Sequence, residues 1–311
     1  MRLLIIAAVM ILVTGCGREA PLSDLHHRWQ QRLEAGNAAA ISGDRVGAIT
    51  AFREALSLSD GFGDNHPDHI ASLEILAACL ASGDGEEEAE RLYRHALALA
   101  GDADSVGADC REGLARLLAA GGRLVEAERL LREALQIRER LRGSDHDDTA
   151  VSCAMLGDVL LALERSSDAE PLYRRALAAW ERNGIADGMN MLAALRGLAQ
   201  CRMIAGNSSE AVGMLEGGLA ILAKTAGTDR RDYVAALNEL IGICAETGDI
   251  AKAMILNDQA IAIIERSLGA SDPNLVIALQ NGAALLRHAG QEDEAERLEA
   301  RAEAITVTAK N

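Results

Sequence analysis

Histidine side chains and clustered carboxylates are the groups in this sequence whose spacing could support metal chemistry. His66 and His69 lie three residues apart, and acidic residues cluster at 86–88 and within 145–148. Paired histidines can bind zinc, and clusters of carboxylates can bind calcium. The histidines, however, fall in a predicted loop, and the run at 86–88 starts a predicted helix, where negative charge favours the helix dipole. We therefore interpret these groups as structural and predict neither a metal site nor a cofactor.

Motifs of the common catalytic classes do not occur in the sequence. It contains no HExxH, GxSxG, P-loop or Rossmann pattern, and an enzyme needs reactive groups that converge on one site. The net charge of −16 disfavours contact with the phosphate backbone of nucleic acids. We therefore predict a protein that is not an enzyme, does not bind nucleic acid and acts by binding a partner.

The cysteines do not form a redox or zinc motif. The chain has six, and one of them, Cys16, belongs to an amino-terminal motif described below. The other five contain no CxxC pair, and an odd number cannot form a complete set of intrachain disulfides; they are Cys79, Cys110, Cys153, Cys201 and Cys244. Because they fall at apolar positions of predicted helices, we interpret them as packed thiols. A disulfide between Cys110 and Cys153 is the alternative.

The amino terminus has the pattern of an export signal. Arg2 precedes an apolar run at 3–13, which is shorter than the roughly 20 residues that a membrane-spanning helix needs. The run ends in Val13-Thr14-Gly15-Cys16, which resembles the lipobox of bacterial lipoproteins. The resemblance implies cleavage before Cys16 and acyl chains on it that hold the protein at a membrane. The alternative is an uncleaved apolar start that inserts directly.

The residue after Cys16 bears on the destination of the exported protein. In Gram-negative lipoproteins an aspartate at this position usually signals retention at the inner membrane, and here the residue is Gly17. In a Gram-negative source we therefore expect an exported, lipid-anchored protein of the outer membrane that faces the periplasm.

The composition of the rest of the chain favours helices. Alanine, leucine, glutamate and arginine dominate, and all four are strong helix formers. Alternating apolar and polar runs, which would indicate strands, are few. In 232–247, apolar residues recur at intervals of three and four, as expected for one face of a helix. Gly248-Asp249 breaks the pattern before it resumes at 250–268, so this segment predicts a helix-turn-helix unit.

A pattern of small and bulky residues repeats along the chain. An alanine is followed four residues later by a bulky residue and three residues after that by a second small residue. The first alanine occurs at Ala48, Ala89, Ala127, Ala169, Ala211, Ala253 and Ala295, so the last four steps are each 42 residues. The bulky residue is Phe52, Tyr93, Leu131, Tyr173 and Leu215, and then Asn257 and Glu299. Small residues let two helices approach closely, and the bulky residue fills the adjacent space.

This alanine–aromatic–alanine pattern resembles the tetratricopeptide repeat. A period near 42 also lies in the armadillo/HEAT range, but the loop Asn65-His66-Pro67-Asp68 resembles that of the kinesin light chain branch of tetratricopeptide repeats. The resemblance implies an all-α, right-handed superhelical solenoid of about seven helix-turn-helix repeats at 23–306. A signal peptide at 1–15 and a tether at 16–22 would precede it, and a tail at 307–311 would follow.

The family resemblance also implies where a partner would bind. In tetratricopeptide arrays the first helix of each repeat lines a concave groove. Carried over repeat by repeat, the groove positions are Arg116, Asp158, Arg196, Gln200, Asn238, Glu239, Gln280 and Asn281. The same comparison reaches Glu34, Asn37, Glu74, Glu112, Arg287 and His288. Kinesin light chain repeats typically carry Leu-Asn-Asn-Leu here, and 237–240 and 279–282 match this in part. The alternative is that these residues are only a solvated helix face.

We therefore expect a lipid-anchored scaffold or adaptor of the cell envelope that binds a protein or peptide in its groove. A carrier or receptor for a small ligand in the lumen of the superhelix is the alternative. Two local expectations follow from the repeat. Gly217 and Gly218 should weaken the second helix of the fifth repeat, and Glu299 and Glu303 should be exposed on the last helix, as in a capping repeat.

Overall fold

The computed structural model describes residues 20–83, 85–100, 104–184, 188–227, 231–270 and 272–308. Every regular element in these ranges is helical, so the prediction of an all-α protein is confirmed. The predicted signal peptide and Cys16 lie outside the described residues, as do most of the predicted tether and the last residues of the predicted tail. The helices begin at Ala20 and end at Thr308.

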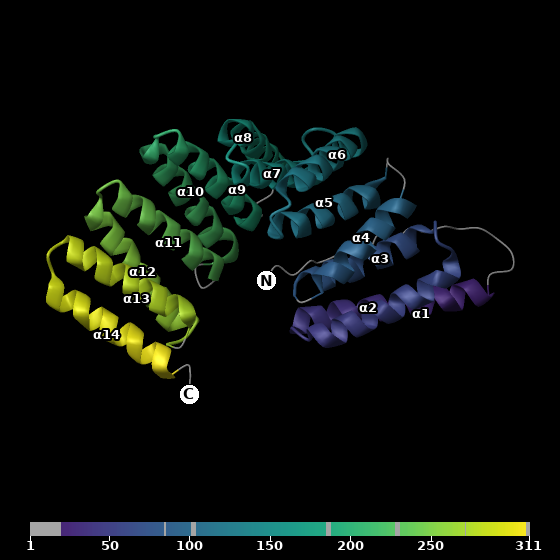
Figure 1. Ribbon diagram of the computed structural model, residues 1–311, viewed down its shortest axis with the longest axis horizontal. Coiled ribbons are helices and arrows are strands. Elements are labelled where there is room, and N and C mark those ends of the chain that lie inside the picture. Colours follow the sequence, from purple (N-terminus) through teal and green to yellow (C-terminus); the bar gives the residue numbers. More distant parts are fainter. Residues whose placement is uncertain are drawn as a thin grey trace. The chain divides into compact units, whose positions relative to one another are not determined.

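The helices follow one another as antiparallel pairs, one pair for each predicted repeat, joined by short turns and loops (Figure 1). Their bounds are α1 (Ala20–Ser42), α2 (Arg45–Ser59), the short 3-10 helix η1 (Asp60–Phe62), α3 (Pro67–Ala81), α4 (Glu86–Leu99), α5 (Ser105–Ala120), α6 (Leu124–Arg142), α7 (Asp147–Ala162), α8 (Ser166–Asn183), α9 (Gly188–Ile204), α10 (Ser208–Ala226), α11 (Arg231–Glu246), α12 (Ile250–Ser267), α13 (Pro273–His288) and α14 (Glu292–Thr308).

The pairs belong to two compact units. The first three repeats, α1–α6, lie in residues 1–144, and the last four, α7–α14, lie in residues 145–311. Within the second unit the first helices of successive repeats contact one another, α7 with α9, α9 with α11 and α11 with α13. In the first unit α3 contacts α5 in the same way. Neighbouring first helices therefore lie side by side throughout the second unit, as do α3 and α5 in the first.

The repeated small and bulky residues form the core of the pairs. The seven recurring alanines from Ala48 to Ala295 are completely buried, and the bulky residues from Phe52 to Leu215 are buried as well. Tyr173 shows why small residues are needed around it. A Cβ atom on Gly157 of its own first helix would lie 2.8 Å from Cζ of the tyrosine ring, and one on Gly197 of the next repeat 2.2 Å from it. The ring therefore fits only between two glycines.

Side-chain caps explain the histidine-containing loops between repeats. Nδ1 of His66 accepts a hydrogen bond from the backbone N–H of Asp68 at 3.2 Å, and His146 caps the start of α7 in the same way through Asp148 at 3.1 Å. Such caps satisfy backbone donors that have no partner inside the helix. In the described ranges no group of three or more histidine, cysteine or acidic side chains is arranged to hold a metal ion.

The cysteines of the helices are packed thiols, as predicted. Cys110, Cys153, Cys201 and Cys244 are buried, and Cys79 is partly buried. Cys110 is a free thiol, so the alternative disulfide with Cys153 is not formed in this structure. Burial raises the pKa of the Cys110, Cys201 and Cys244 thiols. Because the thiolate is the reactive form, this disfavours oxidation and metal binding at these positions.

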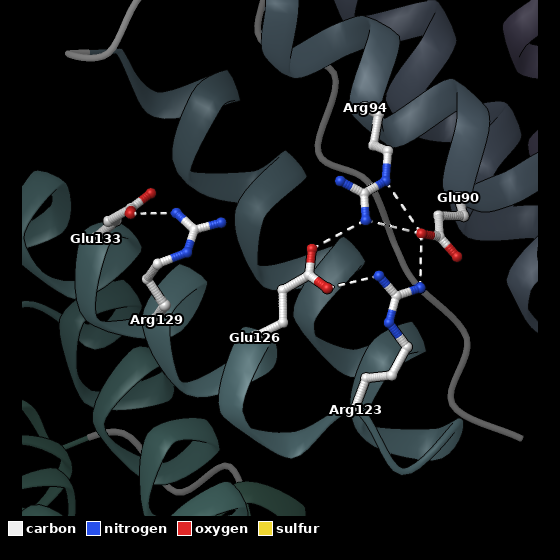
Figure 2. Close-up of polar contacts among 6 residues, drawn as sticks. All are labelled: Glu90, Arg94, Arg123, Glu126, Arg129 and Glu133. Atoms are coloured by element: carbon white, nitrogen blue, oxygen red, sulfur yellow. Dashed lines mark hydrogen bonds and ion pairs between the residues drawn. The ribbon is translucent and has the colours of Figure 1, made fainter.

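Charged side chains connect the second helices of repeats two and three (Figure 2). Arg94 of α4 bonds Glu90 at 2.8 Å and Glu126 of α6 at 2.9 Å, and Arg123 bonds the same two carboxylates at 2.8 and 2.5 Å. The four residues thus form a closed ring between neighbouring repeats. Hydrogen bonds from Arg94 and Arg123 lower the pKa of Glu90, and those from Arg123 and Arg94 lower the pKa of Glu126. Surface ion pairs of this kind contribute only about 0–1 kcal/mol each.

The last helix is solvated on one side, which confirms the expectation for the end of the stack. Glu303 is exposed. Glu299 is partly exposed and accepts hydrogen bonds from Arg287 of α13, one of them at 2.7 Å. An ion pair therefore replaces, at this position, the buried contact that a bulky apolar residue makes in most other repeats.

A buried ionic group lies in the first unit. Arg138 of α6 is almost fully buried and pairs with Asp109 and Glu112 of α5, with Glu112 at 3.3 Å. Glu74 of α3 is partly buried beside them. Burial, followed by the charge of Asp109, raises the pKa of Glu74 to about 7, although the Arg116 guanidinium acts in the opposite direction. The negative charge of Glu74 is therefore the one in this group that neighbouring positive charge compensates least.

The helix α10 contains three glycines, and two of them have no packing role. Gly213 and Gly217 are exposed, and a Cβ atom on either would meet nothing within 4 Å. Gly218 is buried, and a Cβ atom there would lie 2.9 Å from a methyl group of Leu192 and 3.3 Å from one of Leu195. Each unpacked glycine costs about 1 kcal/mol relative to alanine in a helix.

We predict that α10 opens before the other internal second helices, because stability in a repeat array is local. Amide hydrogen exchange should be fastest there between residues 209 and 225. Gly217→Ala should slow this exchange and raise the free energy of unfolding by up to about 1 kcal/mol. Gly218→Ala is the matched control. It should raise the free energy of unfolding less, because its methyl group must displace Leu192. Slower exchange in α10 than in α8 and α12 would contradict this account.

We also predict that folding takes up a proton at Glu74. Its pKa is about 7 in the folded chain and 4.5 as the ordinary value. Between these pH values the folded state holds a proton that the unfolded state has lost, so this group makes stability fall as the pH rises. The free energy of unfolding of Glu74→Gln, relative to that of the parent chain, should therefore increase by about 1–3 kcal/mol as the pH rises from about 4.5 to 7. Denaturant titrations of both chains across this range measure the difference, and a constant difference would refute the prediction.

Candidate partner-binding site

The predicted site residues of the second unit lie on three neighbouring first helices. Arg196 and Gln200 belong to α9, Asn238 and Glu239 to α11, and Gln280 and Asn281 to α13. Gln200, Glu239 and Gln280 are exposed, whereas the other three are partly buried. All six are thus accessible at least in part, as binding residues must be.

One ion pair joins site residues of two of these helices, α9 and α11. Nε of Arg196 donates a hydrogen bond to Oε2 of Glu239 at 2.6 Å, and a second bond joins the same two side chains. The pair connects corresponding faces of α9 and α11. It also neutralises two charges, so the face is less acidic than the chain as a whole.

Asp158 has a structural role that the sequence comparison did not indicate. Its carboxylate accepts a hydrogen bond from the hydroxyl of Tyr173 at 2.7 Å. Burial, together with the Asp158 charge, raises the pKa of Tyr173, so the phenol stays protonated and donates. Asp158 itself is exposed and can still contact a partner with its remaining lone pairs.

The candidates of the first unit divide into surface and buried residues. Arg116 is exposed on α5, and Glu34 and Asn37 lie at least partly exposed on α1. Glu112, by contrast, is buried and paired with Arg138, so the interpretation of this residue as part of an open face is wrong. Its partner comes from α6, and no pattern within the first helices could have indicated that pairing.

The carboxy-terminal candidates also differ from each other. Arg287 of α13 is turned to its own repeat and pairs with Glu299 of α14 and with Glu292 at 2.8 Å. His288 is exposed at the end of α13. Arg287 therefore stabilises the last helix pair, whereas Gln280 and Asn281, which lie on the same helix, make no such charged contact in the described part of the chain.

Two buried amide oxygens in the second unit have no hydrogen-bond partner among the described residues. They are Oδ1 of Asn238 on α11 and Oδ1 of Asn257 on α12. Asn238 was one of the predicted site residues, but Asn257 was not. The signal for Asn257 was present in the sequence, because it occupies the position that holds a tyrosine, phenylalanine or leucine in the first five repeats.

The chemistry available on this face is that of hydrogen bonding. Amides donate and accept, so a row of them can bind the backbone of an extended chain. The described residues hold no cluster of metal-ligating side chains. None of the helices within the described ranges combines the length and apolar character that a membrane-spanning helix requires.

Comparison with known families supports the repeat assignment. The family model of the tetratricopeptide repeat matches residues 110–182, 151–224 and 232–306. None of the curated proteins compared with the chain matches it.

Solved structures show the same architecture. The nearly identical TPR-like repeats assigned to a kinesin light chain of Podosopora anserina have a TM-score of 0.58 and 25% identity, covering 65% of this chain and 95% of that one. BtubC (BKLC) from P. vanneervenii has a TM-score of 0.61 and 23% identity, over 77% and 92% of the two chains. A Signal Transduction ATPase with Numerous Domains protein with a tetratricopeptide repeat sensor, from Pyrococcus horikoshii, has a TM-score of 0.70 and 16% identity, over 92% and 42%.

The family match covers more than half of the chain, and the structural matches extend over both compact units. Together with the buried alanines and the helix pairs, these matches identify the fold. The chain belongs to the tetratricopeptide repeat family, and its helix pairs are similar to those of kinesin light chain-like members.

Proposed function

We propose that this chain is an adaptor of the cell envelope, held at a membrane by lipid on Cys16, that binds an extended segment of a partner protein along α9, α11 and α13. Tetratricopeptide repeat proteins are scaffolds for protein–protein interaction. The proposal is supported by the Arg196–Glu239 ion pair, which joins α9 to α11, and by polar residues of α9, α11 and α13 that are at least partly exposed.

An extended segment fits this face for a physical reason. Its backbone carries N–H and C=O groups that lose hydrogen bonds to water on binding and need new partners. Gln200, Asn238, Gln280 and Asn281 are side-chain amides, each of which can both donate and accept. The paired charges of Arg196 and Glu239 mean that the segment need not be basic, although the chain has a net charge of −16.

The tether is the second part of the proposal and rests on the sequence motif at 13–16. Lipid on Cys16 would hold the helical repeats close to the membrane, and more than one acyl chain would make the attachment stable. A partner bound to the repeats would then be concentrated at the membrane surface.

We predict that replacing Asn238 and Gln280 together by alanine weakens partner binding by about tenfold or more, because two hydrogen-bonding side chains are lost. The partner is identified first by crosslinking to the membrane-held protein, and its affinity is then measured by titration. The fold should be retained, since Gln280 is exposed and the partly buried Asn238 loses no hydrogen bond of its Oδ1 among the described residues. Gln259→Ala, an exposed amide on the second helix α12, is the matched control. If the folded double variant binds the partner with wild-type affinity, this face is not the binding site.

For the tether, we predict that Cys16→Ser abolishes lipid attachment, because the thiol is the group that the lipid modifies. Metabolic labelling with a fatty acid should mark the wild-type chain and leave the variant unmarked, and the variant should leave the membrane fraction. Cys79→Ser, at a partly buried cysteine of α3, should keep the label. Equal labelling of the wild type and of Cys16→Ser would rule out the lipid anchor while leaving the binding face untouched.

A further inference from the structure

The first unit contains a carboxylate that the chain leaves without a partner. Glu74 of α3 makes neither a hydrogen bond nor an ion pair with any residue in the described ranges. It is partly buried, so it has lost part of its hydration, but solvent still reaches it. A carboxylate in such a place is unfavourable unless a cation or a hydrogen-bond donor compensates it.

The second unit shows where a partner for Glu74 would lie. Arg196 and Glu74 each precede the recurring alanine of their repeat by 15 residues, and Glu239 and Gly113 each precede theirs by 14. Arg196 donates to Glu239 at 2.6 Å across α9 and α11. In the first unit α3 contacts α5, as α9 contacts α11. The position that supplies the partner of Arg196 is therefore the bare Gly113 opposite Glu74.

Tyr93 of α4 explains why this position has no side chain. A Cβ atom on Gly113 would lie 2.5 Å from both Cζ and the hydroxyl oxygen of Tyr93, so the tyrosine occupies the space beneath it. Burial, and next the charge of Glu74, raises the pKa of the Tyr93 phenol, which places the carboxylate close to the ring. Tyr93 is 1% exposed, and its hydroxyl makes no hydrogen bond within the described part of the chain, whereas Tyr173 donates to Asp158. Two polar groups without partners thus lie beside Gly113.

The charges around Glu74 favour a cation as the missing partner. Asp109 and Glu112 of α5 both pair with Arg138, so two carboxylates already share one guanidinium. Arg116 is exposed and forms no ion pair with the residues described. Even with Arg116 counted, three carboxylates face two guanidinium groups. This excess of negative charge attracts a cation and repels an anion.

We propose that the surface at Glu74 and Gly113 binds a lysine or arginine side chain of a partner protein, whose cation pairs with the Glu74 carboxylate. Gly113 leaves room for that side chain, and Glu74 is exposed enough to receive it. The site uses no residue of α9, α11 or α13, so it adds a second contact to the proposed function and can fail without it. The competing explanation is a Glu74 carboxyl that carries a proton and binds nothing.

Peptides from a displayed random library, selected against the full chain and counter-selected against Glu74→Gln, provide the probe. The surviving peptides should share a lysine or arginine at one position. Its replacement by methionine should weaken binding about tenfold or more, and Glu74→Gln should weaken the unchanged peptide as much. Glu87→Gln is the matched control. It removes a negative charge from an exposed residue of α4 and should bind as the wild type does.

The pH dependence of binding tests the Glu74 charge directly. Because the pKa of Glu74 is about 7, a proton competes with the bound cation at lower pH. The affinity of the wild type should therefore fall as the pH decreases from about 8 to about 6, and that of Glu74→Gln should not fall in the same way. The variant retains every other ionisable group around the site, namely Tyr93, Cys110, Asp109, Glu112, Arg116 and Arg138.

Three results would overturn the inference. They are survivors that share no cationic residue, survivors whose affinity for the wild type does not change with pH, and a counter-selection that leaves no peptide. The last result leaves the proposed function untouched, because peptides that depend on Asn238 and Gln280 bind Glu74→Gln equally well and are removed by the counter-selection. Methionine replacement in the peptide tests the same pair without any change to the protein.

Discussion

The close approach of an aromatic side chain to glycines of first helices is the contact on which repeats one, two and four depend. Tyr173 illustrates it, because its ring is held between glycines of two successive first helices. The alanines on either side of the ring let the helices of the pair approach, and the ring fixes the distance to the next pair. These contacts align the first helices within a unit. The alignment in turn determines how binding residues on successive first helices are placed.

The sequence was sufficient to predict the helix pairs, because the spacing of the buried alanines encodes the contact directly. It was also sufficient to predict the burial of the cysteines and the exposure of Glu303. The candidate site was less predictable. Whether a polar residue of a first helix faces solvent depends on charged residues far along the chain, as the pairing of Glu112 with Arg138 shows. Periodicity within one helix contains no information about such partners.

Two deviations from the repeat pattern set the sixth repeat apart from the fourth. Asn257 is a buried polar residue at the position that holds an aromatic residue or leucine in the first five repeats, and Gly242 occupies the position of Asp158 in repeat four. Each is unremarkable alone, since asparagine and glycine are common in helical proteins. Their meaning appears only when repeats four and six are compared in three dimensions, because Tyr173 and Asp158 show which contact the sixth repeat lacks.

The histidine caps of the loops fix a chemical detail of those rings. Nδ1 of His66 accepts from a backbone N–H, so the neutral ring must carry its proton on Nε2, and the same holds for His146. The cap thus leaves each ring one nitrogen for other contacts, Nε2, and that nitrogen is a donor.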